Sequence, residues 1–160
     1  MFCPDKSSLI EPGWLSIRFV QKSRLDIFVK VLYSMGLVYS EITLSNPVLS
    51  GLQPLRVRCL ADTGSTYLVI PQHVATQLQL SALETREATT ADGSSHTVPY
   101  AGPVRVTFDG RNCFVGALIM GDEVLLGAVP MEDMDLVVHP KLLKLTVNPD
   151  SPNIPRGHAK

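Results

Sequence analysis

The stretch LADTGSTYLVIP at residues 60–71 decides how this chain is interpreted. Two apolar residues lead into Asp62-Thr63-Gly64-Ser65, and a second apolar run follows directly. An ionised carboxylate within a buried strand is unfavourable unless hydrogen-bond donors surround it. Asp62 is therefore either a plain turn residue, since Asp-x-Gly turns are common, or a reactive acid held in place. The apolar flanks favour the reactive acid and predict that it is unusually buried.

Composition limits the classes of protein to which the chain can belong. Of its 160 residues 45% are hydrophobic and 18% are charged, and its net charge is -1. This supports a single folded domain, and the lack of a basic block predicts no nucleic-acid binding. The cysteines Cys3, Cys59 and Cys113 form no C-x-x-C pair, and the histidines are scattered. We expect a protein of a reducing compartment inside the cell, with no metal site and no cofactor.

The sequence also argues against insertion into a membrane and against secretion. Its most hydrophobic early stretch, residues 14–42, is interrupted by charged side chains such as Arg18, Arg24 and Asp26. A transmembrane helix needs about 20 predominantly apolar residues. The stretch also lacks the uncharged core and the cleavage site of a signal peptide. We therefore expect a cytoplasmic protein without membrane association.

Three segments are expected along the chain. Residues 1–34 form an N-terminal extension, in which apolar residues fall at rough helical spacing with basic residues between them. This extension is either a start assigned too early, with Met35 the true beginning, or a regulatory or removable segment, in one variant a membrane-surface helix. Residues 35–149 form the domain. The proline-rich residues 150–160 are expected to be a disordered tail.

From Met35 onward the pattern is that of an all-β domain. One face of residues 37–44 is apolar, and residues 55–61 alternate apolar side chains with two arginines. Such alternation is typical of strands with one buried face. Asp-Gly pairs at 92–93 and 109–110 predict hairpin turns. Only residues 71–80, which begin with a proline, predict a helix. The predicted fold class is a β-barrel or sandwich with one short α-helix.

Three features in this order resemble the retropepsin-like (clan AA) aspartic proteases, the single-lobe, dimeric relatives of pepsin. They are the Asp-Thr-Gly-Ser stretch, the glycine-tipped hairpin at residues 92–93 and the VLLG stretch at residues 124–127. The chain looks especially like the small prokaryotic members, over roughly residues 36–149. The resemblance implies an acid-protease-type β-barrel, closed or partly open. It also implies that a single lobe forms a twofold homodimer acting on peptide or protein substrates.

The resemblance assigns roles to individual residues. Gly64 suits its place because a glycine lets backbone N–H groups approach the Asp62 oxygens, and Thr63 is implied to reach across the dimer. The implied catalytic residues are Asp62, Thr63 and Gly64, the implied substrate-binding residues are Ser65, Ala91, Asp92 and Gly93, and the structural signature that packs beneath the catalytic loop is Leu125, Leu126 and Gly127.

One Asp-Thr-Gly per chain is half of a catalytic site. Hydrolysis needs one carboxyl group as base and another as acid, and two such groups about 3 Å apart share one proton, as in the well-known aspartic-protease dyad. No second D-T-G or D-S-G occurs in the sequence. Catalysis therefore requires Asp62 from each of two subunits. The alternative is a dimeric β-barrel that binds peptides without cleaving them.

The chain departs from the family pattern in two places. Ala128 and Val129 follow the signature where retroviral members have an arginine, so a charge contact that supports the dimer is missing. Thr66 and Tyr67 stand near the place where those members carry acidic residues that hold the substrate backbone. The first departure leaves the strength of the dimer open, and the second implies a different substrate geometry.

Overall fold

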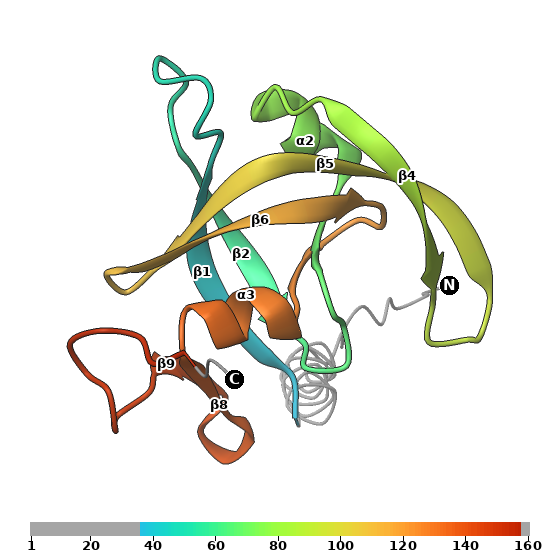
Figure 1. The fold of residues 1–160 in the computed structure, drawn as a ribbon. Helices are drawn as coiled ribbons and strands as arrows, with labels where there is room; N and C mark the ends of the chain where they lie inside the picture. The colour runs from blue at the N-terminus through green and yellow to red at the C-terminus, as the bar shows by residue number, and fades with distance from the viewer. Residues whose placement is uncertain (1–35, 158–160) are drawn as a thin grey trace, which may run out of the picture. The chain divides into compact units, whose positions relative to one another are not determined.

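The structure is a computed structural model, and it describes residues 36–157 (Figure 1). The described residues belong to one compact unit, which begins at Gly36. The predicted N-terminal extension at residues 1–34 therefore lies outside the described residues. In the described part, no helix is long and apolar enough to cross a membrane.

The elements follow one another closely along the chain. They are β1 (Val38–Ser45), β2 (Leu55–Ala61), β3 (Leu68–Ile70), α2 (Gln72–Gln77), β4 (Ala82–Thr89), β5 (Ser95–Phe108), β6 (Arg111–Ile119), β7 (Val124–Leu126), α3 (Ala128–Asp133), β8 (Leu136–His139), the 3-10 helix η1 (Pro140–Leu142) and β9 (Lys144–Val147).

Within residues 36–157, strands β1, β2, β7, β3, β6 and β5 form a closed barrel (Figure 1). Each strand is hydrogen-bonded to the next in this order, and β5 pairs back with β1 to close the ring. The β2–β7 and β3–β6 pairs are parallel, and the other pairs of the ring are antiparallel. Strand β4 extends beyond the ring as the partner of β5, and β8 pairs with β9 in a separate sheet. The predicted all-β barrel is confirmed.

The barrel interior is filled by the side chains that the alternation predicted. Val38, Ile42 and Leu44 of β1 are buried, as is Cys59 of β2, whereas the two arginines on the opposite face of β2 are exposed. Burial raises the pKa of the Cys59 thiol to about 12. The thiol therefore stays protonated and packs as a small apolar side chain.

A second hydrophobic cluster lies on the opposite face of some of the same strands. In β3, Leu68 and Ile70 belong to the main core, whereas Val69 between them joins Val98 of β5 and Leu118 of β6. We call this group the outer cluster. Partly buried side chains that pack against it come from the hairpin and the barrel wall: Tyr67, Ala88, Tyr100, Met120 and Leu125. The β4–β5 hairpin is thus anchored to the barrel by apolar contacts.

Both predicted Asp-Gly turns form hairpins. Asp109 and Gly110 have φ values of 44° and 80° and connect β5 to β6. Two consecutive positive φ values are typical of the tight turns that suit the twist of a hairpin. Gly93, with φ 84°, lies in the turn between β4 and β5.

The helices differ from the prediction. Two short α-helices occur among the described residues, because residues 128–133 form α3 immediately after Gly127. The sequence there contains Pro130, which obscures a helical pattern although proline is compatible with a first helical turn. The predicted helix at residues 71–80 is α2, and it is shorter than expected. It ends at Gln77. Gln79 has a φ of 50°, which is incompatible with a right-handed α-helix.

The segment after β9 makes polar contacts with the rest of the domain, and the predicted disordered tail at residues 150–160 stays a prediction. Arg111 is 5% exposed, and its guanidinium donates to the carbonyl oxygen of Ser151. Asp135 accepts hydrogen bonds from the Ser151 hydroxyl, from Asn148 Nδ2 at 2.8 Å and from the backbone N–H of Arg156 at 3.0 Å. Because Arg111 is buried, its side-chain donors need acceptors, and the C-terminal segment supplies one of them.

Candidate active site

Asp62 lies at the point where β2 leaves the barrel wall. Its backbone N–H donates to the carbonyl oxygen of Leu126 at 3.0 Å, which continues the parallel pairing of β2 with β7. Its side-chain Oδ1 accepts the backbone N–H of Gly64 at 2.9 Å. The N–H of Ser65 donates to the Asp62 carbonyl oxygen at 3.2 Å and closes the turn. The carboxylate is therefore fixed to the backbone of its own loop.

Gly64 serves this turn by allowing a close approach. A Cβ atom at this position would lie 3.2 Å from Asp62 Oδ1. The φ of Gly64 is not in the left-handed region, so the backbone angle does not itself require glycine. A side chain here would instead crowd the carboxylate and shift it from its N–H donor.

The segment that follows β7 holds the Asp62 loop from the other side. The N–H of Ala128 donates to the carbonyl oxygen of Ser65 at 2.7 Å, and the N–H of Val129 donates to that of Thr66 at 3.0 Å. Both donors belong to the first turn of α3, where backbone N–H groups have no partner within the helix. The loop thus provides acceptors for two backbone N–H groups at the start of α3, and these hydrogen bonds hold the loop in place.

Gly127 makes this contact possible. A Cβ atom on Gly127 would lie 2.3 Å from the carbonyl oxygen of Tyr67 and 2.7 Å from that of Ser65. Leu126 beside it is fully buried in the main core, and Leu125 packs on the outer cluster. The structure therefore brings the three signature residues against the loop that carries Asp62.

The Asp62 loop is accessible in the single chain. Asp62 is half-buried, and Thr63, Gly64 and Thr66 are exposed. The sequence predicted a more deeply buried acid. The difference arises because the apolar flanks of the loop enter the barrel while the loop itself emerges at the end of the β2 strand.

The tip of the β4–β5 hairpin is organised by its own side chains. Asp92 Oδ1 accepts hydrogen bonds from the Thr90 hydroxyl at 2.6 Å and from the hydroxyl and N–H of Ser94 at 2.7 and 3.1 Å. The Thr90 and Ser94 hydrogen bonds lower the pKa of Asp92. Ser94 Oγ also lies 3.0 Å from Nε2 of His96. The Asp92 carboxylate is thus engaged in holding the turn.

The hairpin tip and the Asp62 loop are separate in the single chain. Ala91, Asp92 and Gly93 are exposed, and no hydrogen bond joins them to Asp62 or Ser65 among residues 36–157. The structure brings together the predicted catalytic residues and the predicted signature, and it leaves the predicted substrate-binding tip at the end of the hairpin.

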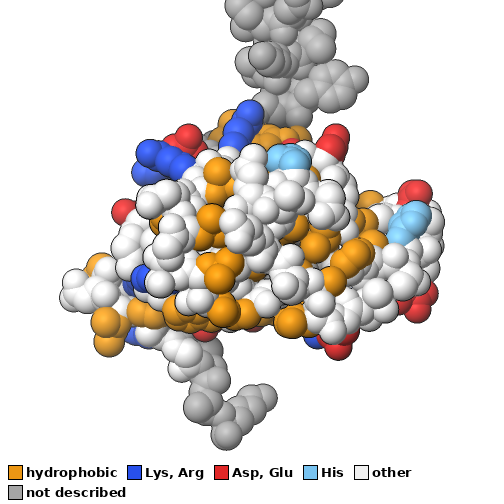
Figure 2. Space-filling view, turned by 90° about the horizontal axis from the view of Figure 1, so that it is seen from above, with side chains coloured by type: hydrophobic (Ala, Val, Ile, Leu, Met, Phe, Trp, Pro, Cys, Tyr) orange, Lys and Arg blue, Asp and Glu red, His pale blue; other side chains and the backbone are white. Residues whose placement is uncertain are grey.

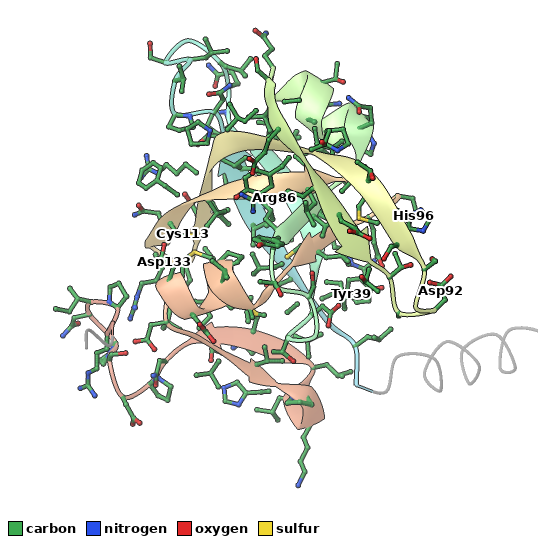
Figure 3. The ribbon with its side chains drawn as sticks, turned by 45° about the vertical axis from the view of Figure 1, so that its right-hand side comes forward. Tyr39, Arg86, Asp92, His96, Cys113 and Asp133 are labelled. Carbon is green, nitrogen blue, oxygen red and sulfur yellow. The ribbon has the colours of Figure 1, made fainter. Side chains whose placement is uncertain are left out.

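Arg86, which the sequence patterns did not single out, lies near the root of the hairpin (Figure 3). Its Cζ is 3.5 Å from the ring centroid of Tyr100 and 5.2 Å from that of Tyr67. The two rings meet edge to face, with their centroids 5.9 Å apart. Glu84 Oε1 lies 2.6 Å from both Nε and Nη2 of Arg86. The Asp-Gly turn could have indicated this place, because it sets Arg86 opposite Val98 of the outer cluster.

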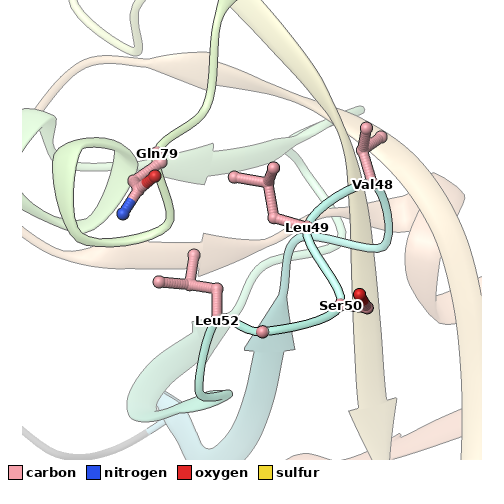
Figure 4. A pocket seen from close by; sticks show the side chains of 6 residues that line it. Val48, Leu49, Ser50, Leu52 and Gln79 are labelled. Carbon is pink, nitrogen blue, oxygen red and sulfur yellow. The ribbon is translucent and has the colours of Figure 1, made fainter.

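Two hollows occur elsewhere on the domain. One, of about 390 Å³, is lined by residues 48–52 of the β1–β2 loop and by Gln79 (Figure 4). The other, of about 350 Å³, has Arg58, His73 and Glu123 among its lining residues. Figure 2 shows hydrophobic side chains exposed across the middle of one face, with charged side chains toward its margins. Neither hollow includes Asp62.

Comparisons with known proteins show which family the chain resembles. A family model described as aspartyl protease matches residues 49–128, which is half of the chain and includes the Asp62 loop and Gly127. Among solved structures, the chain is similar to the EIAV protease complexed with the inhibitor HBY-793. That similarity has a TM-score of 0.46 and 16% identity, and it covers 61% of this chain and 86% of that chain. A search of curated proteins finds no match.

Proposed function

This chain belongs to the aspartyl protease family, and from that premise we propose that it is an aspartic endopeptidase active as a homodimer. The Asp62 loop carries the proposal. It presents an acid that is bound to the N–H of Gly64 and held from behind by the Gly127 segment. A fixed and accessible carboxylate of this kind is what water activation requires.

In the proposed mechanism the two Asp62 carboxyl groups of a dimer share one proton. The ionised group takes a proton from a water molecule, whose oxygen attacks the scissile carbonyl carbon. The protonated group gives its proton to the carbonyl oxygen. Collapse of the tetrahedral intermediate then breaks the C–N bond. The carboxyl group that took the water proton gives it to the leaving nitrogen, and a hydroxyl of the intermediate returns a proton to the other carboxylate, which restores the shared proton. The Gly64 N–H keeps one carboxylate oxygen oriented throughout.

The exposed surface around the loop supports a contact with a second copy. Leu37 and Val129 are each 42% exposed although both are apolar. Leu37 immediately precedes Val38, which pairs with Ala61 next to Asp62, and Val129 is hydrogen-bonded to the loop at Thr66. Burying these two side chains across a twofold axis would bring the two loops together without the arginine of retroviral members.

The substrate is proposed to lie between the Asp62 loop and the β4–β5 hairpin. Ser65 and the backbone at Ala91, Asp92 and Gly93 would contact an extended peptide, because backbone groups at a hairpin tip can pair with it as a strand does. Closure of the hairpin would then exclude water from the reacting bond.

A cytoplasmic location is part of the same proposal. Cys59 and Cys113 are free thiols, and both are buried in the barrel. Unpaired cysteines agree with a reducing compartment.

The test of the function is the Asp62→Asn variant, assayed on a peptide library across a range of pH with and without a pepstatin-like inhibitor. We expect it to lose cleavage by about a thousandfold or more, because it removes both the acid and the base. Its circular dichroism and its mass by light scattering should match the wild type. Asp122→Asn, a change at an exposed acid remote in sequence from the loop, is the matched control and should cleave normally.

Two outcomes would contradict the endopeptidase. Cleavage by Asp62→Asn at the wild-type rate would place the chemistry elsewhere. Peptide binding by both proteins without cleavage by either would identify the alternative, a peptide-binding β-barrel that keeps the fold of the family.

A further inference from the structure

We propose that Arg86 makes this site selective for peptides that carry an acidic side chain close to the bond that is cleaved. The inference rests on the proposed function, because it assigns a substrate class to the same site. It concerns the hairpin root, which neither the Asp62 loop nor the hairpin tip includes.

Arg86 lies on the face of the hairpin that is turned toward the barrel. Its partner across the hairpin is Val98, a member of the outer cluster, and the next inward pair along β4 is Ala88 with His96. Tyr67, under the guanidinium, directly follows the Asp62 loop and accepts the Ser65 hydroxyl at its carbonyl oxygen. A peptide passing between the hairpin and the Asp62 loop would therefore run beside Arg86.

The guanidinium is held in one orientation and keeps donors free. Glu84 Oε1 takes the edge formed by Nε and Nη2. The Tyr100 ring covers one face of the guanidinium plane. Within residues 36–157 no other acceptor binds the Arg86 side chain, so the Nη1 edge remains available. An arginine fixed in this way offers a preorganised fork for a carboxylate.

The surroundings favour a negative partner. The two tyrosine rings and the apolar outer cluster lie beside the Arg86 side chain, which is 33% exposed. Partial shielding strengthens the attraction between opposite charges relative to water. The loop positions that carry acids in retroviral members are Thr66 and Tyr67 here, so no carboxylate from the loop competes. Glu84 is the acid that neutralises Arg86 in part, and His96 lies further toward the hairpin tip.

The test compares peptides that differ only in one side chain. Glu, Gln or Lys is placed in turn at each position that flanks the scissile bond of a peptide cleaved by the wild type, and kcat/KM is measured. At one or more positions we expect a preference for Glu over Gln of about two- to fivefold, the size of one ion pair at a partly exposed site. The preference for Glu over Lys should be larger, and added salt should reduce both.

Three variants assign the preference to Arg86. Arg86→Gln should bring the Glu/Gln ratio to about one while cleavage of the Gln peptide persists, and Arg86→Lys should leave an intermediate ratio. Glu84→Gln should raise the ratio, because the competing carboxylate is removed. The matched control is Arg105→Gln, which removes an arginine stacked 5.9 Å from the Phe114 ring near the opposite end of β5 and should change nothing.

The outcomes separate this inference from the proposed function. A wild-type ratio near one at every position, or a ratio unchanged in Arg86→Gln, overturns the selectivity and leaves the endopeptidase intact. If no peptide is cleaved, the endopeptidase fails. A library peptide that binds the wild type is then made with Glu or Gln at each position in turn, labelled with a fluorophore and titrated against the wild type. Tighter binding of the Glu peptide that is lost in Arg86→Gln supports the selectivity, and equal binding overturns it.

Discussion

Single atoms decide the geometry around Asp62. Gly127 has room for a hydrogen and for nothing larger, because the carbonyl oxygens of Tyr67 and Ser65 occupy the space of a side chain. Those same residues belong to the loop that orients the acid. A methyl group at residue 127 would therefore affect stability and catalysis together.

We expect Gly127→Ala to lower the free energy of unfolding by about 2–4 kcal/mol, the range of severe overpacking. The neighbouring atoms are backbone oxygens, and they cannot move without breaking the hydrogen bond from Ala128 to Ser65. Urea denaturation followed by circular dichroism measures the change. Gly51→Ala is the control, since a Cβ atom there meets nothing within 4 Å, and it should change stability by no more than about 1 kcal/mol. Equal stability of the two variants would contradict the account.

At the scale of elements, the segment after β9 is held in place by polar contacts. Arg111, buried at the start of β6, lies 3.9 Å from Asp135, which follows α3. The Ser151 hydroxyl, then Asn148 and the backbone N–H of Arg156, lower the pKa of Asp135 from 3.8 to about 2. This acid therefore links three parts of the chain that are distant in sequence.

The lowered pKa predicts a pH dependence of stability. A carboxyl group with a folded pKa below its unfolded value contributes its full stabilisation above the unfolded pKa and loses it as pH falls through the folded one. Asp135→Asn should therefore be less stable than the wild type at pH 7, and the gap should narrow as pH is lowered from about 4 to about 2. Urea midpoints across this range measure it. Asp150→Asn is the charge-matched control, and a gap that is constant with pH would refute the assignment.

The strands could be predicted from sequence because their information is local. Alternation identified the buried face of β1, and the Asp-Gly pairs identified both hairpins. The β1–β5 closure could not be predicted, because it depends on pairs such as Leu44 with Val106 that are distant in the chain. The hydrogen bond between Arg111 and Ser151 could not be predicted for the same reason.

The candidate site was predictable in part. The Asp62 loop and the Gly127 segment were found because each has a short motif of its own. Their hydrogen bonds and the half-exposed state of Asp62 required the three-dimensional arrangement. Arg86 was missed because an arginine in a polar strand has no distinctive sequence pattern. Only the structure shows that its guanidinium lies over the rings of Tyr67 and Tyr100.

At the scale of the whole molecule, the proposed site belongs to two chains. Each subunit would supply one Asp62 loop. Activity should therefore follow the concentration of dimers and not the total concentration of subunits. This dependence can be tested without any knowledge of the interface.

Mixing subunits is the sharpest form of that test. Wild type and Asp62→Asn are combined in equal amounts and allowed to exchange, and cleavage is compared with that of the undiluted wild type at the same total concentration. Random pairing should leave about one quarter of the activity, because only wild-type homodimers have two acids. Mixing with Arg105→Gln in place of Asp62→Asn should leave activity unchanged. A residual activity of about one half would show that each chain works alone.

Strand β5 belongs both to the β4–β5 hairpin and to the barrel wall. Residues 95–101 pair with β4 in the hairpin, residues 100–101 and 104–108 pair with β6 in the barrel wall, and the register with β6 shifts between Ala101 and Val104. Asp62 and Gly127 lie on neither part. Substitutions at residues 82–100 can therefore change the range of peptides that the proposed enzyme accepts, while the residues proposed to hydrolyse them stay the same. A lineage built on this scaffold would diversify in what it cleaves long before it changed how it cleaves.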